Sequence, residues 1–190
     1  MQNPSDVLEY WLRQVGPEKW YQGGDDLDAE IRDKFKETWE AAKDGKLSEW
    51  MMKPEMILAY LILLDQFPRN MFRGTSKAFS TDRQARCAAK KAIDKRWDMR
   101  VAEPERQFFY LPLMHSECLC DQERCVRLML TRMPESGEEQ LLHAKAHREV
   151  IRRFGRFPYR NEALDRSVTA PEASFLEAGG YGAAMEAVRV

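Results

Sequence analysis

The stretch MILAYLILLDQFPRN, residues 56–70, decides the fold of this chain. Its first nine residues are apolar all round, and such a run is compatible with either a buried strand or a buried helix. Leu, Met and Ala outnumber the β-branched residues, and Pro54 suits the first position of a helix. We therefore predict a central, fully packed helix that ends at Phe67, because Pro68 cannot continue the helical hydrogen bonding.

Amphipathic helices are expected on both sides of this run. Apolar residues recur at helical spacing in residues 5–14, 27–43, 80–94, 117–131 and 138–154. A shorter helix should begin near Thr169, because Pro171 then lies just inside its first turn. No segment alternates with period two as a strand would. These patterns predict an all-α fold of about seven or eight helices, joined by short loops into antiparallel hairpins.

Length and composition favour one globular domain over residues 1–190, with disorder expected only in about the last ten residues. The chain is 44% hydrophobic and 32% charged, which is enough apolar material for a core. Its formal charge of -1 provides no general attraction to nucleic acid or to an anionic membrane. The longest apolar run is too short to span a bilayer. We expect a cytoplasmic protein with no membrane or nucleic-acid partner and no cofactor.

Two turns in the sequence look alike. Residues 67–70 read FPRN and residues 157–161 read FPYRN, and each follows a long expected helix. A structural interpretation is that Phe anchors the turn, Pro stops the helix and Arg bonds the exposed carbonyls, while Asn accepts a left-handed conformation. The alternative is that the two turns contribute their Arg and Asn side chains to a binding site.

Motifs along almost the whole chain resemble those of the family called domain of unknown function 924. They comprise residues 63–70, Ala78-Phe79 with Asp82, residues 110–112, His115-Ser-Glu117 with Gln122, Ala144 with His147, residues 154–158, and Arg160-Asn161. The resemblance implies a helical fold similar to the tetratricopeptide-repeat superfamily. It implies no established activity.

The second turn departs from the family's pattern at two positions. Asp165 stands where the family usually has Gly, and Tyr159 stands where it usually has His. If the glycine normally takes a positive φ, Asp165 must adopt a strained conformation or the loop must shift. Whether Arg166 takes the position that the resemblance implies depends on which of these occurs.

The three histidines suggest several kinds of site. His147 shares a helix face with apolar residues and should point inward, either as a satisfied core residue or as a ligand or acid/base group. His143 lies one turn earlier, but the sequence fixes no third metal ligand. His115 precedes Ser116, an expected helix cap, at a place that would attract an anion. The four cysteines are expected to be free thiols, and no metal site is predicted.

Our main hypothesis is a helical binding domain with an Arg- and His-rich polar pocket for a small anionic ligand or an acidic peptide end. The arginines between positions 148 and 166 could hold an anion through bidentate contacts or could form an interior network with acids. One alternative is an enzyme that uses His115 or His147 as general acid/base on an anionic substrate, and another is a protein-interaction scaffold with a purely structural cluster. The sequence does not give the oligomeric state. The predicted ligand-binding residues are Asp65, Gln66, Arg69, Asn70, His115, Glu117, Gln122, His147, Arg153, Arg156, Arg160 and Asn161.

Overall fold

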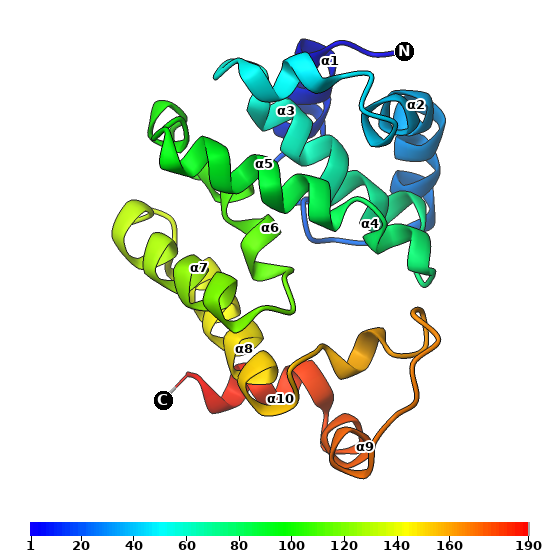
Figure 1. The fold of residues 1–190 in the computed structure, drawn as a ribbon, viewed down its shortest axis with the longest axis vertical. Coiled ribbons are helices and arrows are strands. Elements are labelled where there is room, and N and C mark those ends of the chain that lie inside the picture. The colour runs from blue at the N-terminus through cyan, green and yellow to red at the C-terminus, as the bar shows by residue number, and fades with distance from the viewer. Residues whose placement is uncertain (190) are drawn as a thin grey trace. The chain divides into compact units, whose positions relative to one another are not determined.

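The computed structural model describes residues 1–189, which are 69% helical and contain no strand. Consecutive α-helical and π-helical segments combine there into eight helices of seven or more residues, which confirms the predicted all-α class. The chain divides into two compact units, residues 1–112 and 113–190 (Figure 1). The short helix α6 (Leu111–Met114) contains the division.

The first unit contains five of the labelled helices, together with short 3-10 and π-helical segments. The helices are α1 (Pro4–Leu8), α2 (Asp25–Lys43), α3 (Ile57–Leu61), α4 (Phe67–Met71) and α5 (Asp82–Asp94). The π-helical segment Glu9–Val15 continues α1 as far as Gly16, the predicted stop. The start differs from the prediction, because Asn3 rather than Ser5 caps the helix in a reciprocal arrangement with Asp6.

The central helix continues past Pro68, so the prediction that it ends there is wrong. A π-helical segment, Ile62–Gln66, joins α3 to α4, and Pro68 occupies the first turn of α4. Proline cannot donate to the carbonyl of Leu64 four residues earlier. The hydroxyl of Thr81 donates to that carbonyl instead, at 2.7 Å. The chain therefore bypasses the missing bond by widening the helix before the proline and by supplying a side-chain donor.

Aromatic side chains fill the core of the first unit. Phe67 is fully buried and contacts Tyr10, Trp11 and Phe35, with ring centroids 4.6 to 6.3 Å apart. These rings come from the first helix, α2 and α4, so residues far apart in the sequence share one core. The predicted role of Phe67 as the anchor of its turn is confirmed.

The second unit contains α7 (Leu119–Arg132), α8 (Glu138–Phe154), α9 (Ala170–Glu177) and α10 (Gly180–Ala187). Helix α8 has the predicted bounds and ends at Gly155, which takes the left-handed conformation with φ of 68°. Helix α9 begins after Thr169, as predicted, in a capping box with Glu172. The structure differs from the sequence expectation near the end of the chain, where α10 occupies residues that were expected to be disordered.

The start of α7 also differs from the prediction. The helix begins at Leu119, and Ser116 is not its cap. The Ser116 hydroxyl donates to Asp121 at 2.8 Å and accepts from the backbone N–H of Cys118 at 3.3 Å. The segment that carries His115 is therefore a turn ahead of the helix rather than its first residues.

Helix α8 is the centre of the second unit and packs against α7 and α10, with which it shares most of its contacts (Figure 1). Its apolar face forms a core with residues from the second turn, α9 and α10. This core consists of Ala146, Val150, Ile151, Phe157, Phe175 and Ala184. Phe157 is thus the buried anchor of the second turn, as predicted.

Candidate functional site

The polar residues of the first turn are held in ion pairs within the first unit. The guanidinium of Arg69 donates to both carboxylate oxygens of Asp82 at 3.0 Å and also to the backbone carbonyl of Asp65. The side chain of Gln66 donates to the Asp65 carboxylate. The prediction that Arg69 bonds a helical carbonyl is confirmed, because that carbonyl lies in the π-helical segment. These contacts make the first turn a rigid polar network.

Asn70 takes part in a second ion pair of the same unit. Its side-chain amide donates to Asp28 at 2.8 Å, and Arg73 donates to both oxygens of that carboxylate at 2.7 and 3.0 Å. Burial alone would raise the pKa of Asp28, but the hydrogen bonds from Arg73 and Asn70 lower it below its usual value. Asn70 lies inside α4, so the left-handed conformation expected for it is wrong.

Three predicted site residues come together in the second unit. The imidazole rings of His115 and His147 have centroids 6.3 Å apart. The guanidinium of Arg160 lies 4.3 Å from the centre of the Phe157 ring and donates to the backbone carbonyl of His115 at 3.1 Å. The ring of His147 contacts the same Phe157 ring at 5.4 Å. We call His115, His147, Phe157, Arg160 and Tyr181 the histidine–arginine cluster.

Tyr181 of α10 joins the two histidines of α8. Its hydroxyl lies 2.6 Å from Nδ1 of His143 and 3.2 Å from Nδ1 of His147. Nδ1 of His147 is also 2.9 Å from the backbone carbonyl of His143, and a carbonyl can only accept, so Nδ1 carries the proton. The tautomer of His147 therefore leaves its Nε2 as the unprotonated nitrogen.

The surroundings keep His147 neutral. Burial lowers its pKa most strongly. The nearby His115 and Arg160 add to this effect and the bond to the His143 carbonyl opposes it, so that the pKa is lowered overall to about 3. Burial also lowers the pKa of His143 below its usual value. The cluster thus contains a neutral imidazole at physiological pH, next to the guanidinium of Arg160.

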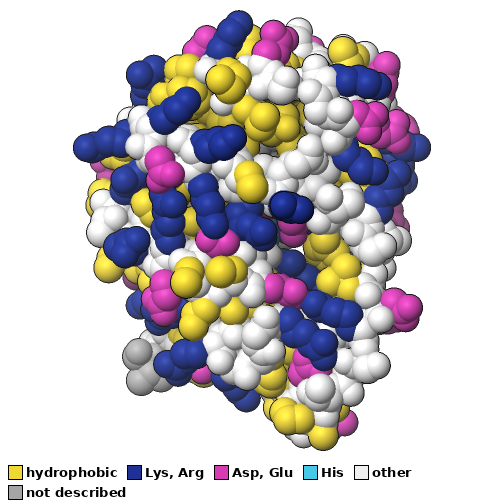
Figure 2. All heavy atoms as spheres, viewed as in Figure 1, with side chains coloured by type: hydrophobic (Ala, Val, Ile, Leu, Met, Phe, Trp, Pro, Cys, Tyr) yellow, Lys and Arg dark blue, Asp and Glu magenta, His cyan; other side chains and the backbone are white. Residues whose placement is uncertain are grey.

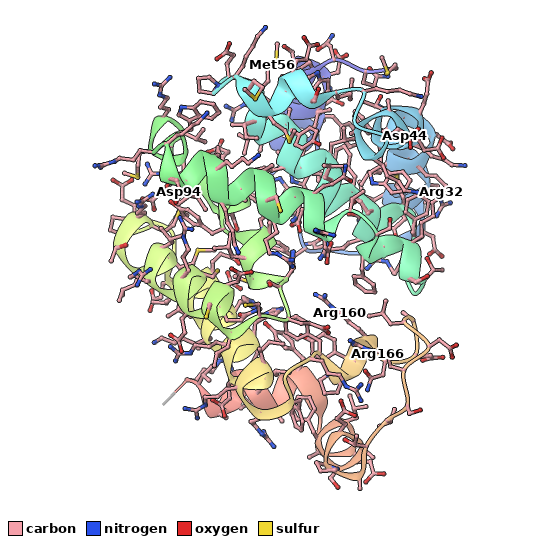
Figure 3. The ribbon with its side chains drawn as sticks, in the orientation of Figure 1. Arg32, Asp44, Met56, Asp94, Arg160 and Arg166 are labelled. Carbon is pink, nitrogen blue, oxygen red and sulfur yellow. The ribbon has the colours of Figure 1, made fainter. Side chains whose placement is uncertain are left out.

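Glu117 closes the second turn rather than capping a helix. Its carboxylate accepts from the backbone N–H of Phe157 at 2.9 Å and from both terminal nitrogens of Arg166 at 2.9 and 3.1 Å. Burial would raise the pKa of Glu117, but the bonds from Arg166 and Phe157 lower it overall. Figure 3 labels Arg160 and Arg166, which both come from the segment that follows α8.

The departure at position 165 is accommodated by backbone strain. Asp165 takes a left-handed conformation with φ of 51°, whereas Asn161 has φ of -60° and lies in the right-handed region. The left-handed residue of the second turn is therefore Asp165 and not the Asn161 expected from the repeated motif. Because the loop keeps this conformation, Arg166 still reaches Glu117.

The remaining predicted residues of the second unit lie outside the histidine–arginine cluster. Arg156 forms a bidentate ion pair with Glu172 at 2.6 and 2.8 Å. Arg153 is exposed and stacks on Phe154 and Phe175. Gln122 donates to the backbone carbonyls of Met114 and Ser116 at 2.6 and 2.7 Å, and Asn161 is buried beside the turn. These contacts are those of residues that hold the unit together.

Sequence reasoning missed Tyr181 and Glu172 as members of these networks, whereas the interior pairing of an arginine with Glu117 was one of its alternatives and is made by Arg166. Glu172 was visible only as part of a helix start, and its pairing with Arg156 bridges 16 residues. Tyr181 lies in the tail that was expected to be disordered, so nothing local indicated that it would contact α8. A single pocket built from both turns stays a prediction, because the first turn belongs to one compact unit and the second turn to the other.

The described residues offer neither a metal cluster nor a membrane-spanning helix. Residues 1–189 contain no group of three or more His, Cys, Asp or Glu side chains arranged to hold a metal ion. No helix among them combines the length and apolar character required to cross a membrane. The four cysteines are free thiols, as predicted, with Cys125 buried and the other three exposed.

Comparison with known proteins identifies the family. An all-helical protein with this histidine–arginine cluster matches the family model described as a bacterial protein of unknown function (DUF924) over residues 7–180. The chain belongs to this family. A solved structure described as a protein of unknown function, ATU0120 from Agrobacterium tumefaciens, is similar to it with a TM-score of 0.85 and 39% identity. That match covers 92% of this chain and 97% of the other. Among curated proteins, none matches the chain.

Proposed function

We propose that this chain is a binding domain whose second unit takes a small anionic ligand or an acidic peptide end at the histidine–arginine cluster. The observation that carries the proposal is the convergence of His115, His147 and Arg160 from three separate segments. Both Arg160 and His147 pack against the ring of Phe157. A planar guanidinium held against an aromatic ring is well suited to bind carboxylate or phosphate through two parallel bonds.

Other arginines of the two turns are less suited to this role. Arg69, Arg156 and Arg166 each donate two bonds to one carboxylate. A ligand would have to displace an internal acid from each of them, which costs the ion pair already formed. We therefore assign these bidentate pairs to the folded framework. We place the ligand at Arg160 because it lies beside His115 and shares the Phe157 ring with His147.

The enzyme alternative is weakened at His147. A general acid/base at neutral pH works best with a pKa near 7, whereas burial holds the pKa of His147 at about 3. His147 is more useful as a neutral hydrogen-bonding group, with its tautomer fixed by the His143 carbonyl. An enzymatic mechanism at this cluster would have to use His115. The cytoplasmic location and the similarity to tetratricopeptide repeats also stay predictions.

A thermal-shift series tests the proposal. The probes are inorganic phosphate, succinate and the peptide Glu-Glu-Glu, each titrated into the intact protein. A ligand that binds only the folded state raises stability by about 2.7 kcal/mol at a hundredfold excess over its Kd. We expect at least one probe to raise the melting temperature of the wild-type protein in a saturable way.

Two variants and a matched control localise the effect. Arg160→Lys keeps the charge but removes the planar fork, and His147→Asn keeps a donor for the His143 carbonyl but removes Nε2. Both should lose most of the shift, whereas the control Arg153→Lys, on the exposed side of α8, should retain it. If no probe shifts the wild-type protein, or if Arg160→Lys responds like Arg153→Lys, the cluster is structural and the proposal is wrong.

A further inference from the structure

A cleft of about 400 Å³ in the first unit has features of a separate ligand site. It lies beside α5, and the loop after α2 and the 3-10 helix Ser48–Met52 provide its other side. The volume falls within the range of small-molecule sites in proteins. The lining residues are Gly45, Met51, Tyr60, Arg83, Gln84, Cys87, Ala88 and Lys91.

Tyr60 is the buried polar group of this cleft. The residue is only 1% exposed, yet its hydroxyl has no hydrogen-bond partner among residues 1–189. The small surface that Tyr60 exposes lies at this hydroxyl. A buried hydroxyl without a partner loses hydrogen-bond energy, which a ligand acceptor in the cleft would restore.

Two cations and a thiol lie along the same face of α5. Arg83, Cys87 and Lys91 are spaced four residues apart, so their side chains follow one another along the helix. All three are exposed, and within residues 1–189 neither Arg83 nor Lys91 forms an ion pair. The cleft therefore has positive charge that no internal carboxylate neutralises.

The cleft has apolar lining residues, and a hydrogen bond holds the helices beside it together. Met51, Ala88 and the Tyr60 ring offer apolar surface. Gln84 donates to the backbone carbonyl of Lys43 at 3.0 Å, which ties α5 to the end of α2. Gly45, in the loop after α2, has φ of 78° and open space where a side chain would project.

We infer that this cleft binds a small organic anion, with its negative group at Arg83 and Lys91, an acceptor atom at the Tyr60 hydroxyl and an apolar body against Met51 and Ala88. This site is separate from the histidine–arginine cluster. Cys87 lies between the two cations, so a bound molecule would shield its thiol.

Alkylation of Cys87 by iodoacetamide reports on occupancy, with phenyl phosphate as the probe. Mass spectrometry of the intact, folded protein follows the rate at each exposed thiol. We expect saturating phenyl phosphate to slow alkylation of Cys87 at least tenfold, while Cys118 and Cys120, which are exposed on the second unit, react at unchanged rates. Phenol, which lacks the anion, should not protect Cys87.

Variants of the lining residues test how the probe is held. Tyr60→Phe removes only the hydroxyl. It should raise the concentration of phenyl phosphate that gives half-maximal protection roughly three- to tenfold, the effect of one hydrogen bond. The double variant Arg83→Gln with Lys91→Gln should abolish protection, and the control Lys36→Gln on α2 should leave it intact. Absence of protection in the wild-type protein, equal protection of Cys118, or protection that survives the double variant would overturn the inference.

Discussion

At the scale of single residues, arginine forks hold both turns in place. In four ion pairs, two nitrogens of one guanidinium meet two oxygens of one carboxylate, a geometry that fixes direction as well as distance. The pairs are Arg69–Asp82, Arg73–Asp28, Arg156–Glu172 and Arg166–Glu117. Arg160 donates to the backbone carbonyl of His115 and packs against the Phe157 ring.

Two of these carboxylates make the stability of the protein depend on pH. The pKa values of Glu117 and Glu172 are lowered in the folded state, by Arg166 and Arg156 respectively, from an ordinary value of 4.5. Below pH 4.5 the unfolded chain therefore binds more protons than the folded one, and stability falls as the pH drops toward the folded pKa values. We expect urea titrations between pH 6 and 3 to show this loss.

Glu117→Gln should reduce the slope of stability against pH in that range. The matched control is Glu162→Gln, an exposed residue next to the same turn. Equal slopes for the wild-type protein and Glu117→Gln would show that the Glu117–Arg166 pair does not set this dependence.

Backbone strain at Asp165 gives a second prediction at this scale. A left-handed conformation costs a residue with a side chain about 1 kcal/mol, less for Asp than for Ala, and costs glycine almost nothing. We expect Asp165→Gly to raise the melting temperature by roughly 2–4 °C and Asp165→Ala to lower it. Calorimetry of the three proteins checks the order Gly, Asp, Ala, and a glycine variant less stable than the wild type would refute the strain.

At the scale of elements, periodicity and caps predicted helices well where local sequence decides. Helix α8 has its predicted bounds, and the start signature at Thr169 opens α9. The predicted end of the central helix was wrong. Pro68 leaves the Leu64 carbonyl without a backbone donor, and Thr81, which is distant in the sequence, donates to that carbonyl instead. Long-range donors of this kind cannot be predicted from the helix's own residues.

A double-mutant cycle tests this explanation of the central helix. Thr81→Val leaves the Leu64 carbonyl without its donor and also removes the acceptor of the Trp39 indole N–H. We expect it to cost roughly 1–3 kcal/mol of unfolding free energy. Pro68→Ala restores a backbone N–H for the same carbonyl, so it should recover part of that loss in the double variant.

The control for this cycle is Thr75→Val, an exposed threonine that bonds the Phe72 carbonyl within a turn. Its cost should be well below that of Thr81→Val. Strict additivity of Thr81→Val and Pro68→Ala, measured by urea unfolding, would mean that the two residues do not serve the same carbonyl.

At the scale of the whole molecule, the sequence predicted the all-α class but not which distant residues contact one another. The candidate site was predictable in part. His147 was expected to point inward, and Arg160 was expected to hydrogen-bond exposed carbonyls at the second turn. The partners that define the cluster, Tyr181 and the His115 carbonyl, lie 34 and 45 residues away from His147 and Arg160. Figure 2 shows basic and acidic side chains interspersed on one face, in keeping with the small net charge.

The prediction of a single domain is tested by calorimetry. Each of the two units has buried apolar residues of its own, and the chain length is typical of one domain. We expect one cooperative transition, with equal calorimetric and van't Hoff enthalpies. Two transitions with separate midpoints would show that residues 1–112 and 113–190 unfold as independent domains.

The most direct measurement of the central claim is a nuclear magnetic resonance titration of the three histidine side chains with inorganic phosphate, the acidic peptide Glu-Glu-Glu and succinate. Without ligand, the His147 imidazole should stay neutral from pH 8 to pH 5, because burial lowers its pKa to about 3. With a binding anion, His115 and His147 should shift together along one saturable curve, and the pKa of His147 should rise, since a nearby negative charge favours the protonated form. Unchanged His115 and His147 resonances with all three probes would contradict anion binding at the histidine–arginine cluster.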